Sequence, residues 1–161
     1  MARFALNLAV VVCSSILLVG CFPLWETLKV ESISIGPDGT LTGRETGWNT
    51  ERPSDYKTTL KPGAMVRASL GPSASVCGNA DATGCYIEGT LVRLELSSDG
   101  RAVSALVFTI QRLRVYIPAR KNPVEARVPA EEVRVALADI LAFYHTNVSA
   151  CTFFTCGSLN W

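Results

Sequence analysis

Hydrophobic and polar residues alternate along much of the chain after residue 25, a pattern typical of β-strands that bury one face. The alternation is clearest in Tyr86–Leu96, where Val92, Leu94 and Leu96 lie on one face and Arg93 and Glu95 on the other. Comparable patterns predict further strands at Glu26–Ile35, Thr40–Thr42, Ala64–Leu70, Ala102–Ile117 and Glu125–Val128.

Turns and irregularities in these strands are also visible in the pattern. Asp-Gly pairs at 38–39 and 99–100 predict tight turns, because glycine tolerates the positive φ that such turns need. The parity of the apolar positions changes between Val30 and Ile33, and again between Ile110 and Leu113. No turn residue separates Ile110 from Leu113, so the change predicts a β-bulge or a bend.

Near the C-terminus the hydrophobic spacing lengthens to three and four residues, which predicts one helix over Pro129–His145. Pro129 suits its first turn, and His145 suits its last turn. The predicted fold class is therefore α+β, mostly β: an antiparallel sheet or small sandwich with one C-terminal helix packed on it.

The segment Gly43–Gly63 is polar, contains Pro53 and Pro62, and shows no period. It is predicted to be a long surface loop, which is uncommon in a compact domain unless it is functional or mobile. Trp48 and Tyr56 within it are either contact residues or loop anchors that pack on the domain.

The N-terminus carries an apolar run, residues 4–19, after the single cation Arg3. This run is shorter than the roughly 20 apolar residues that a membrane-spanning helix needs, and it is typical of a secretory signal peptide. It ends at Leu18-Val19-Gly20-Cys21. These four residues resemble the lipobox of bacterial lipoprotein precursors: leucine, a small or aliphatic residue, glycine or alanine, then cysteine.

The resemblance implies that residues 1–20 are cleaved off and that Cys21 carries acyl chains such as palmitate on its sulfur and its new amino group. Two or more chains anchor a protein firmly. Phe22 follows the cysteine where inner-membrane lipoproteins have aspartate, which implies the outer membrane of a bacterial envelope, facing the periplasm. The alternatives are an ordinary signal peptide with an incidental cysteine and an uncleaved membrane helix.

The predicted organisation is a signal peptide (1–20), a lipidated tether (21–25) and one β-rich domain (26–161). Removing 20 of the 161 residues leaves 141, a usual size for one domain. It also removes Arg3, which leaves 14 basic and 14 acidic residues. A neutral chain is not typical of nucleic-acid binding, so we expect no nucleic-acid partner.

The other cysteines fit an exported, oxidised domain. With Cys13 in the signal peptide and Cys21 acylated, four remain, namely Cys77, Cys85, Cys151 and Cys156. Four cysteines allow three pairings; we favour Cys77–Cys85 and Cys151–Cys156, because each closes a short loop. A four-cysteine zinc site is the alternative, but neither pair has the usual two-residue spacing.

Patterns of catalytic or cofactor-binding residues are missing from the sequence. The one histidine, His145, has no neighbouring ligands, and the Gly-x-Ser-x-Gly pattern of a serine nucleophile is absent. No glycine-rich phosphate loop opens a helix. We therefore expect no enzymatic activity, no metal and no cofactor.

The most prominent polar feature is a basic stretch, residues 101–134, with seven Arg or Lys against three Glu. Arg112, Arg114 and Tyr116 share one strand face, so this face is a possible binding surface, together with Trp48 and Tyr56. The alternative is a solvated strand face that discourages edge pairing.

These patterns predict a membrane-anchored envelope lipoprotein that acts as a non-enzymatic binding or assembly component with an envelope protein partner. The alternative is a periplasmic inhibitor or ligand-binding module that recognises an anionic glycan, lipid or protein.

Overall fold

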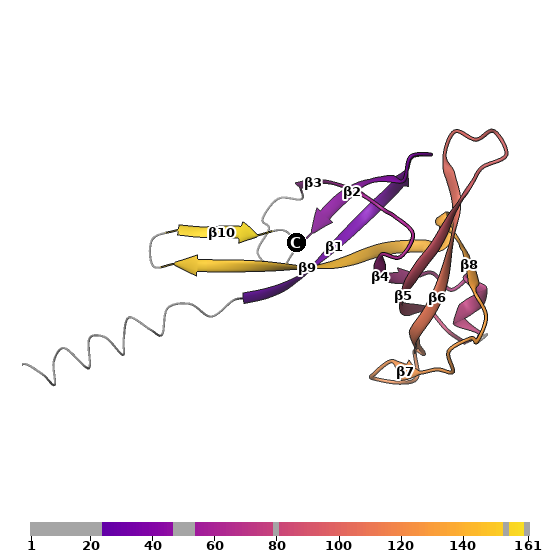
Figure 1. Ribbon diagram of the computed structural model, residues 1–161. Coiled ribbons are helices and arrows are strands. Elements are labelled where there is room, and N and C mark those ends of the chain that lie inside the picture. Colours follow the sequence, from indigo (N-terminus) through magenta and orange to yellow (C-terminus); the bar gives the residue numbers. More distant parts are fainter. Residues whose placement is uncertain (1–23, 47–53, 79–80, 153–154, 160–161) are drawn as a thin grey trace, which may run out of the picture. The chain divides into compact units, whose positions relative to one another are not determined.

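The computed structural model describes residues 24–46, 54–78, 81–152 and 155–159, and these residues form antiparallel β-strands with two short 3-10 turns (Figure 1). The strands are β1 (Leu24–Ile35), β2 (Thr40–Thr46), β3 (Ser54–Thr59), β4 (Met65–Leu70), β5 (Gly84–Leu96), β6 (Val103–Tyr116), β7 (Val124–Glu125), β8 (Val133–Ala136), β9 (Ile140–Thr152) and β10 (Thr155–Leu159). The 3-10 turns are η2 (Ser75–Cys77) and η3 (Leu137–Asp139). The α+β prediction is wrong, because no α-helix occurs among the described residues.

The chain divides into two units, residues 28–145 and residues 1–27 with 146–161, and each is described by itself. In the larger unit the strand order is β3-β2-β1-β9-β4-β5-β6-β7, and β8 pairs with β6 beside β7. In the smaller unit the far part of β9 pairs with β10, and the register sets Cys151 opposite Cys156. The side chains of these two cysteines lie outside the described residues.

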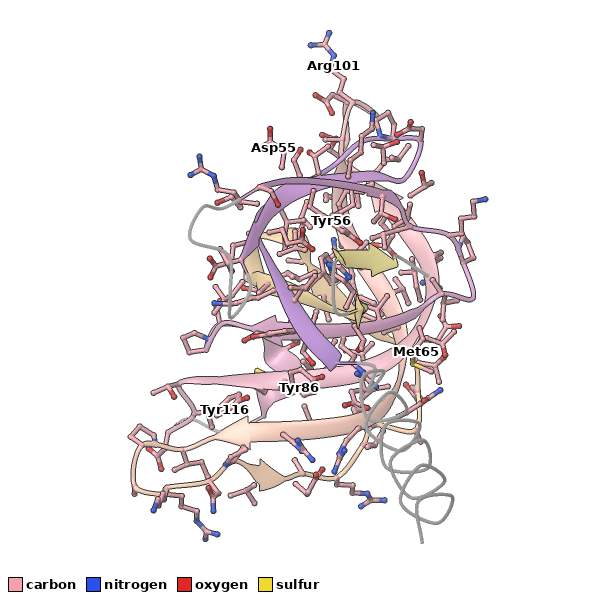
Figure 2. The ribbon with its side chains drawn as sticks, turned by 90° about the vertical axis from the view of Figure 1, so that its left-hand side faces the viewer. Asp55, Tyr56, Met65, Tyr86, Arg101 and Tyr116 are labelled. Carbon is pink, nitrogen blue, oxygen red and sulfur yellow. A yellow bond between two sulfur atoms is a disulfide. The ribbon has the colours of Figure 1, made fainter. Side chains whose placement is uncertain are left out.

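The sheet of the larger unit curls so that its two halves share one core. Val30, Ile35 and Leu41 from β1 and β2 belong to the same buried cluster as Leu91 and Phe108 from β5 and β6. Figure 2 shows β1 and β2 arching over the strands β4 to β6. One sheet can bury a hydrophobic face only by packing against another layer, and here it packs against itself.

Both predicted bulges are present. In β1, Ser32 has φ +54° and the register with β2 shifts between Glu31 and Ser34. In β6 the register with β5 shifts so that Glu88 pairs with Arg112 while Gly89 pairs with Ile110, which leaves Gln111 as the extra residue. Each bulge lets the strand keep its apolar side chains on the inner face after the change of parity.

Most predicted strands are confirmed. The β5–β6 hairpin forms around the predicted Asp99-Gly100 turn, with Gly100 at φ +67°. β4 buries Val66, Ala68 and Leu70 and exposes Met65 and Arg67, as its alternation predicts.

The predicted helix over Pro129–His145 is wrong, because this segment forms β8, η3 and the start of β9. Val133–Ala136 pairs with residues 105–108 of β6, and Ile140–Tyr144 pairs with residues 67–70 of β4. The exposure pattern also contradicts an amphipathic helix that buries its apolar residues, since Leu141 is 54% exposed. Long-range strand pairing here overrides the local spacing.

The predicted loop over Gly43–Gly63 is wrong at both ends. β2 continues to Thr46, and Ser54–Thr59 forms the edge strand β3, which pairs with β2 over six residues. β3 stands at the end of the strand order and buries little of its surface, so the hydrophobic pattern did not reveal it. Trp48 lies outside the described residues.

A disulfide joins Cys77 in η2 to Cys85 in β5, with a Cα–Cα distance of 5.4 Å, as the sequence predicts. Both cysteines are buried in the core. Because each sulfur is bonded to the other, neither thiolate is available for the alternative zinc site.

Candidate binding surface

The outward side of β4, β5, β6, β7 and β9 carries a set of tyrosine, arginine and glutamate side chains, which we call the tyrosine–arginine face: Arg67, Tyr86, Glu88, Arg112, Arg114, Tyr116, Glu125 and Tyr144. The strand register arranges most of them in two rows. One row runs Tyr144, Arg67, Glu88, Arg112, and the other runs Tyr86, Arg114, Glu125. Figure 2 labels Tyr86 and Tyr116 on this side of the sheet.

Two arginines of this face share one carboxylate. Glu125 Oε1 accepts hydrogen bonds from Arg112 Nε at 3.0 Å and from Arg114 Nε at 2.7 Å. The hydrogen bond from Arg114 has the larger effect and that from Arg112 the next, and together they hold the pKa of Glu125 below its usual value. The β6–β7 hairpin therefore folds a carboxylate back onto two arginines that stand two residues apart on β6.

Glu88 ties the aromatic part of the face to its cations. The Tyr86 hydroxyl donates a hydrogen bond to Glu88 Oε1 at 3.3 Å, and Arg67 Nε lies 3.9 Å from the same oxygen. Partial burial raises the pKa of Tyr86 to about 12, and the negative charge of Glu88 adds to the effect. Tyr86 meets Tyr144 edge-on, with ring centroids 5.7 Å apart.

Charge and exposure define what this face can bind. Three arginines oppose two glutamates, so the face has a net charge of +1 and more hydrogen-bond donors than acceptors. Tyr116 is 41% exposed and offers an aromatic surface beside the arginines. Arginine and tyrosine are enriched where proteins bind partners, because both combine a flat surface with hydrogen bonding.

The residues predicted for a binding face do not all meet. Arg112, Arg114 and Tyr116 lie together on β6, but Tyr56 lies on β3, at the opposite end of the strand order. The face predicted from the sequence lacked Arg67, Tyr86, Glu88 and Tyr144. Alternation in β4 placed Arg67 on the outer face, but in β5 it grouped Tyr86 and Glu88 with the apolar face of the strand. The register shift between Leu91 and Arg93 reverses the parity there. Tyr144 had been assigned to the incorrect helix.

Tyr56 instead belongs to a second polar cluster, with Glu45 of β2 and His145 of β9. His145 Nε2 and Glu45 Oε1 are 2.7 Å apart, and the rings of Tyr56 and His145 stack with centroids 4.7 Å apart. Burial raises the pKa of Tyr56. His145 therefore does not cap a helix; it connects β9 to the β2–β3 hairpin.

This cluster lacks the arrangement of a hydrolytic triad. The Ser54 hydroxyl donates to the second oxygen of Glu45 at 3.3 Å, so the carboxylate stands between the serine and the imidazole. A triad needs the imidazole to accept the serine proton directly. The arrangement is that of a structural clamp between strands.

The described residues contain no group of three or more potential metal ligands. None of their helical segments is long and apolar enough to cross a membrane. Cys21 and the predicted signal peptide lie outside the described residues.

The chain matches no protein-family model, and neither the curated proteins nor the solved structures include one with significant similarity to it.

Proposed function

We propose that the protein is a lipid-anchored lipoprotein of a bacterial envelope, which binds an envelope protein partner through the tyrosine–arginine face without catalysing a reaction. The anchor rests on the lipobox Leu18-Val19-Gly20-Cys21 at the end of the apolar run. The buried Cys77–Cys85 disulfide supports export, because such bonds persist in oxidising compartments.

The arginine pair carries the binding part of the proposal. Arg112 and Arg114 are both held by one carboxylate, and Tyr86, Tyr116 and Tyr144 lie on the same face. Prealigned donors lose less conformational freedom on binding than mobile ones. A partner with acidic side chains complements the net charge of +1, and guanidinium groups bind carboxylates in a fixed geometry.

The same face also fits the second candidate, a module that recognises an anionic glycan. The specific observation is the two-residue spacing of Arg112 and Arg114 beside the exposed ring of Tyr116. The two candidates differ in what remains bound after purification: an assembly component retains a protein partner, whereas a glycan-binding module retains polysaccharide.

Palmitate labelling in bacterial cells tests the anchor. We expect the full chain to incorporate labelled palmitate and Cys21→Ser to incorporate none. Mass spectrometry of the mature N-terminus serves as the second readout. An unlabelled wild-type chain that retains residues 1–20 would contradict the anchor.

Affinity purification from detergent-solubilised envelopes tests the face. Arg112→Glu combined with Arg114→Glu should lower recovery of the partner about tenfold, which corresponds to roughly 1.4 kcal/mol of binding free energy. The control, Arg101→Glu with Lys61→Glu, changes net charge equally at exposed positions outside the face. Equal loss of partner in both double variants would show a general charge effect and contradict the proposed surface.

A further inference from the structure

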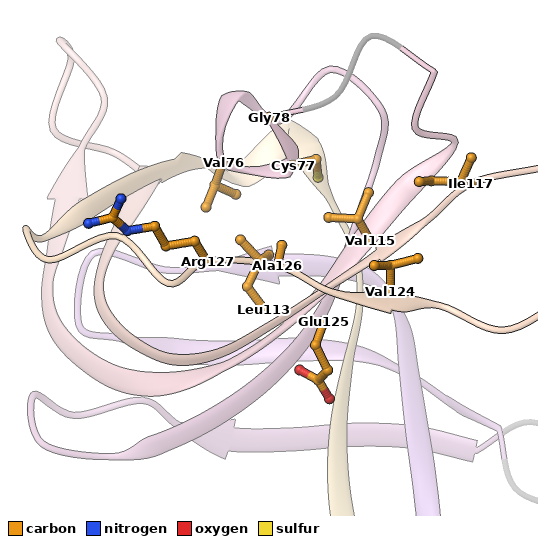
Figure 3. Close-up of a pocket in the computed structure, with 10 residues that line it drawn as sticks. All are labelled: Val76, Cys77, Gly78, Leu113, Val115, Ile117, Val124, Glu125, Ala126 and Arg127. Atoms are coloured by element: carbon orange, nitrogen blue, oxygen red, sulfur yellow. The ribbon is translucent and has the colours of Figure 1, made fainter. Parts of the chain in front are cut away.

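An apolar cavity of about 370 Å³ lies between η2 and the β6–β7 hairpin (Figure 3). Its walls are formed mainly by aliphatic side chains: Val76, Leu113, Val115, Ile117, Val124 and Ala126. Figure 3 shows these side chains in a row, from Val76 and Ala126 at one end to Ile117 at the other. The Cys77–Cys85 disulfide fixes one wall, because Cys77 also lines the cavity.

The two charged residues at this cavity differ in whether an ion pair within the protein already binds them. Glu125 is bound by Arg112 and Arg114, and Figure 3 shows its carboxylate directed away from the aliphatic side chains. Arg127 is exposed and has no ion pair within the described part of the chain. Its guanidinium extends past Val76 at one end of the row. The charge that a ligand could meet at the cavity is therefore positive and lies at one end of it.

We propose that this cavity binds a single acyl chain with an anionic head group, of the fatty-acid class, with its head group at Arg127. The aliphatic side chains suit a hydrocarbon chain, because each CH₂ group that is buried among them leaves water. A cavity of this volume is at the small end of ligand sites, which suits a chain of medium length. A guanidinium binds a carboxylate through two parallel hydrogen bonds, so Arg127 selects an anionic head group.

The site is independent of the tyrosine–arginine face, although both use the β6–β7 hairpin. Leu113 and Val115 point inward from β6, whereas Arg112 and Arg114 point outward. Glu125 contributes to both sides, and its bonds to the arginines hold β7 in place as one wall of the cavity. The ligand proposed here is distinct from any acyl chain on Cys21, since it is held without a covalent bond.

Photo-crosslinking tests the proposal on the full chain in lipid nanodiscs. The probe is a medium-chain fatty acid that bears a diazirine at its far end, and tandem mass spectrometry locates the crosslinks. Because the head group lies at Arg127, we expect the crosslinks at the other end of the cavity, to Val115, Ile117 and Val124, and we expect unlabelled fatty acid to compete for them. Ala126→Trp fills the cavity and should lower this crosslinking about tenfold. Val76→Phe, on the opposite wall, is a second filling variant in case Ala126→Trp does not fold.

The head-group requirement has its own control. Arg127→Gln should lower crosslinking of the fatty acid but not of the matching fatty alcohol, while Arg101→Gln, the same change at the β5–β6 turn, should alter neither. Crosslinks outside the cavity in the wild-type protein would overturn the proposal. So would undiminished labelling in both filling variants, provided that circular dichroism shows them folded.

Discussion

At the scale of single residues, Glu125 is the group on which the binding face depends most. Its carboxylate is exposed, yet the hydrogen bonds from Arg114 and Arg112 lower its pKa from the usual 4.5. A carboxyl group whose pKa is lower in the folded state stabilises that state above pH 4.5, and the contribution is lost as the pH falls through the folded-state pKa.

We therefore predict that Glu125→Gln lowers the urea midpoint of unfolding at pH 7, and that its difference from wild type shrinks progressively below pH 4.5. Urea titrations at a series of pH values measure this difference. The control is Glu131→Gln, since Glu131 is exposed and has no ion pair within the described residues. A difference for Glu125→Gln that is independent of pH would mean that ionisation of the carboxylate contributes nothing.

The sequence identified part of this face, for a physical reason. Residues two apart on one strand share a face by backbone geometry alone, so Arg112, Arg114 and Tyr116 were grouped correctly on β6. Their contacts with Glu125 depend on the register of the β6–β7 hairpin. Tyr144 reaches the face through pairing between β9 and β4, more than seventy residues apart in the chain, which no local pattern records.

At the scale of strands, two glycines stand opposite the bulges of β1 and β6. Gly43 faces the bulge of β1, and a Cβ atom there would lie 2.6 Å from Val30 Cγ1. A Cβ atom on Gly89 would lie 2.6 Å from the carbonyl oxygen of Thr109, a backbone atom that cannot move aside by itself. The bulge and the glycine thus form one unit, because the extra residue brings the two backbones together.

Gly89→Ala should lower the free energy of unfolding by about 1–3 kcal/mol, the usual cost of overpacking. Gly71→Ala is the matched control: its Cβ atom would meet nothing closer than 3.7 Å, and the substitution reduces unfolded-state entropy. It should therefore raise stability by up to roughly 1 kcal/mol. Urea denaturation measures both, and equal effects of the two substitutions would contradict the clash.

The sequence predicted strands well where one face is buried and poorly elsewhere. Both parity changes were correctly interpreted as bulges, because burial forces the apolar residues back to the inner face. β3 was missed because an edge strand with alternating Asp55 and Lys57 buries little. The false helix arose because Val133, Leu137 and Ile140 begin three successive elements, β8, η3 and β9, and their combined spacing imitates a helical repeat.

At the scale of the whole molecule, the sequence predicted many of the strands and turns but not the closure of the sheet. The turn between β1 and β2 reaches β5: a Cβ atom on Gly39 would lie 3.2 Å from Leu94 Cδ1 and 2.6 Å from the carbonyl oxygen of Leu60. The contact with Leu94 joins segments more than fifty residues apart, and hydrophobic periodicity carries no information about it. They turn one sheet into a closed core within residues 28–145.

A shared core predicts cooperative unfolding of residues 28–145. Leu41 of β2 and Leu91 of β5 are 1% and 0% exposed and lie in the two facing halves of the sheet. Because both fill the same core, Leu41→Ala and Leu91→Ala should each lower the free energy of unfolding by about 2–5 kcal/mol. Each variant should keep a single transition with an unchanged denaturant slope, whether followed by far-ultraviolet or by near-ultraviolet circular dichroism. Leu141→Ala, at a 54% exposed position on β9, should change stability by less than about 0.5 kcal/mol.

If Leu41→Ala instead produced a separate early transition that left β5 and β6 intact, the β1–β3 half would fold as an independent layer. In that case only the strands from β4 to β9 would hold the tyrosine–arginine face rigid.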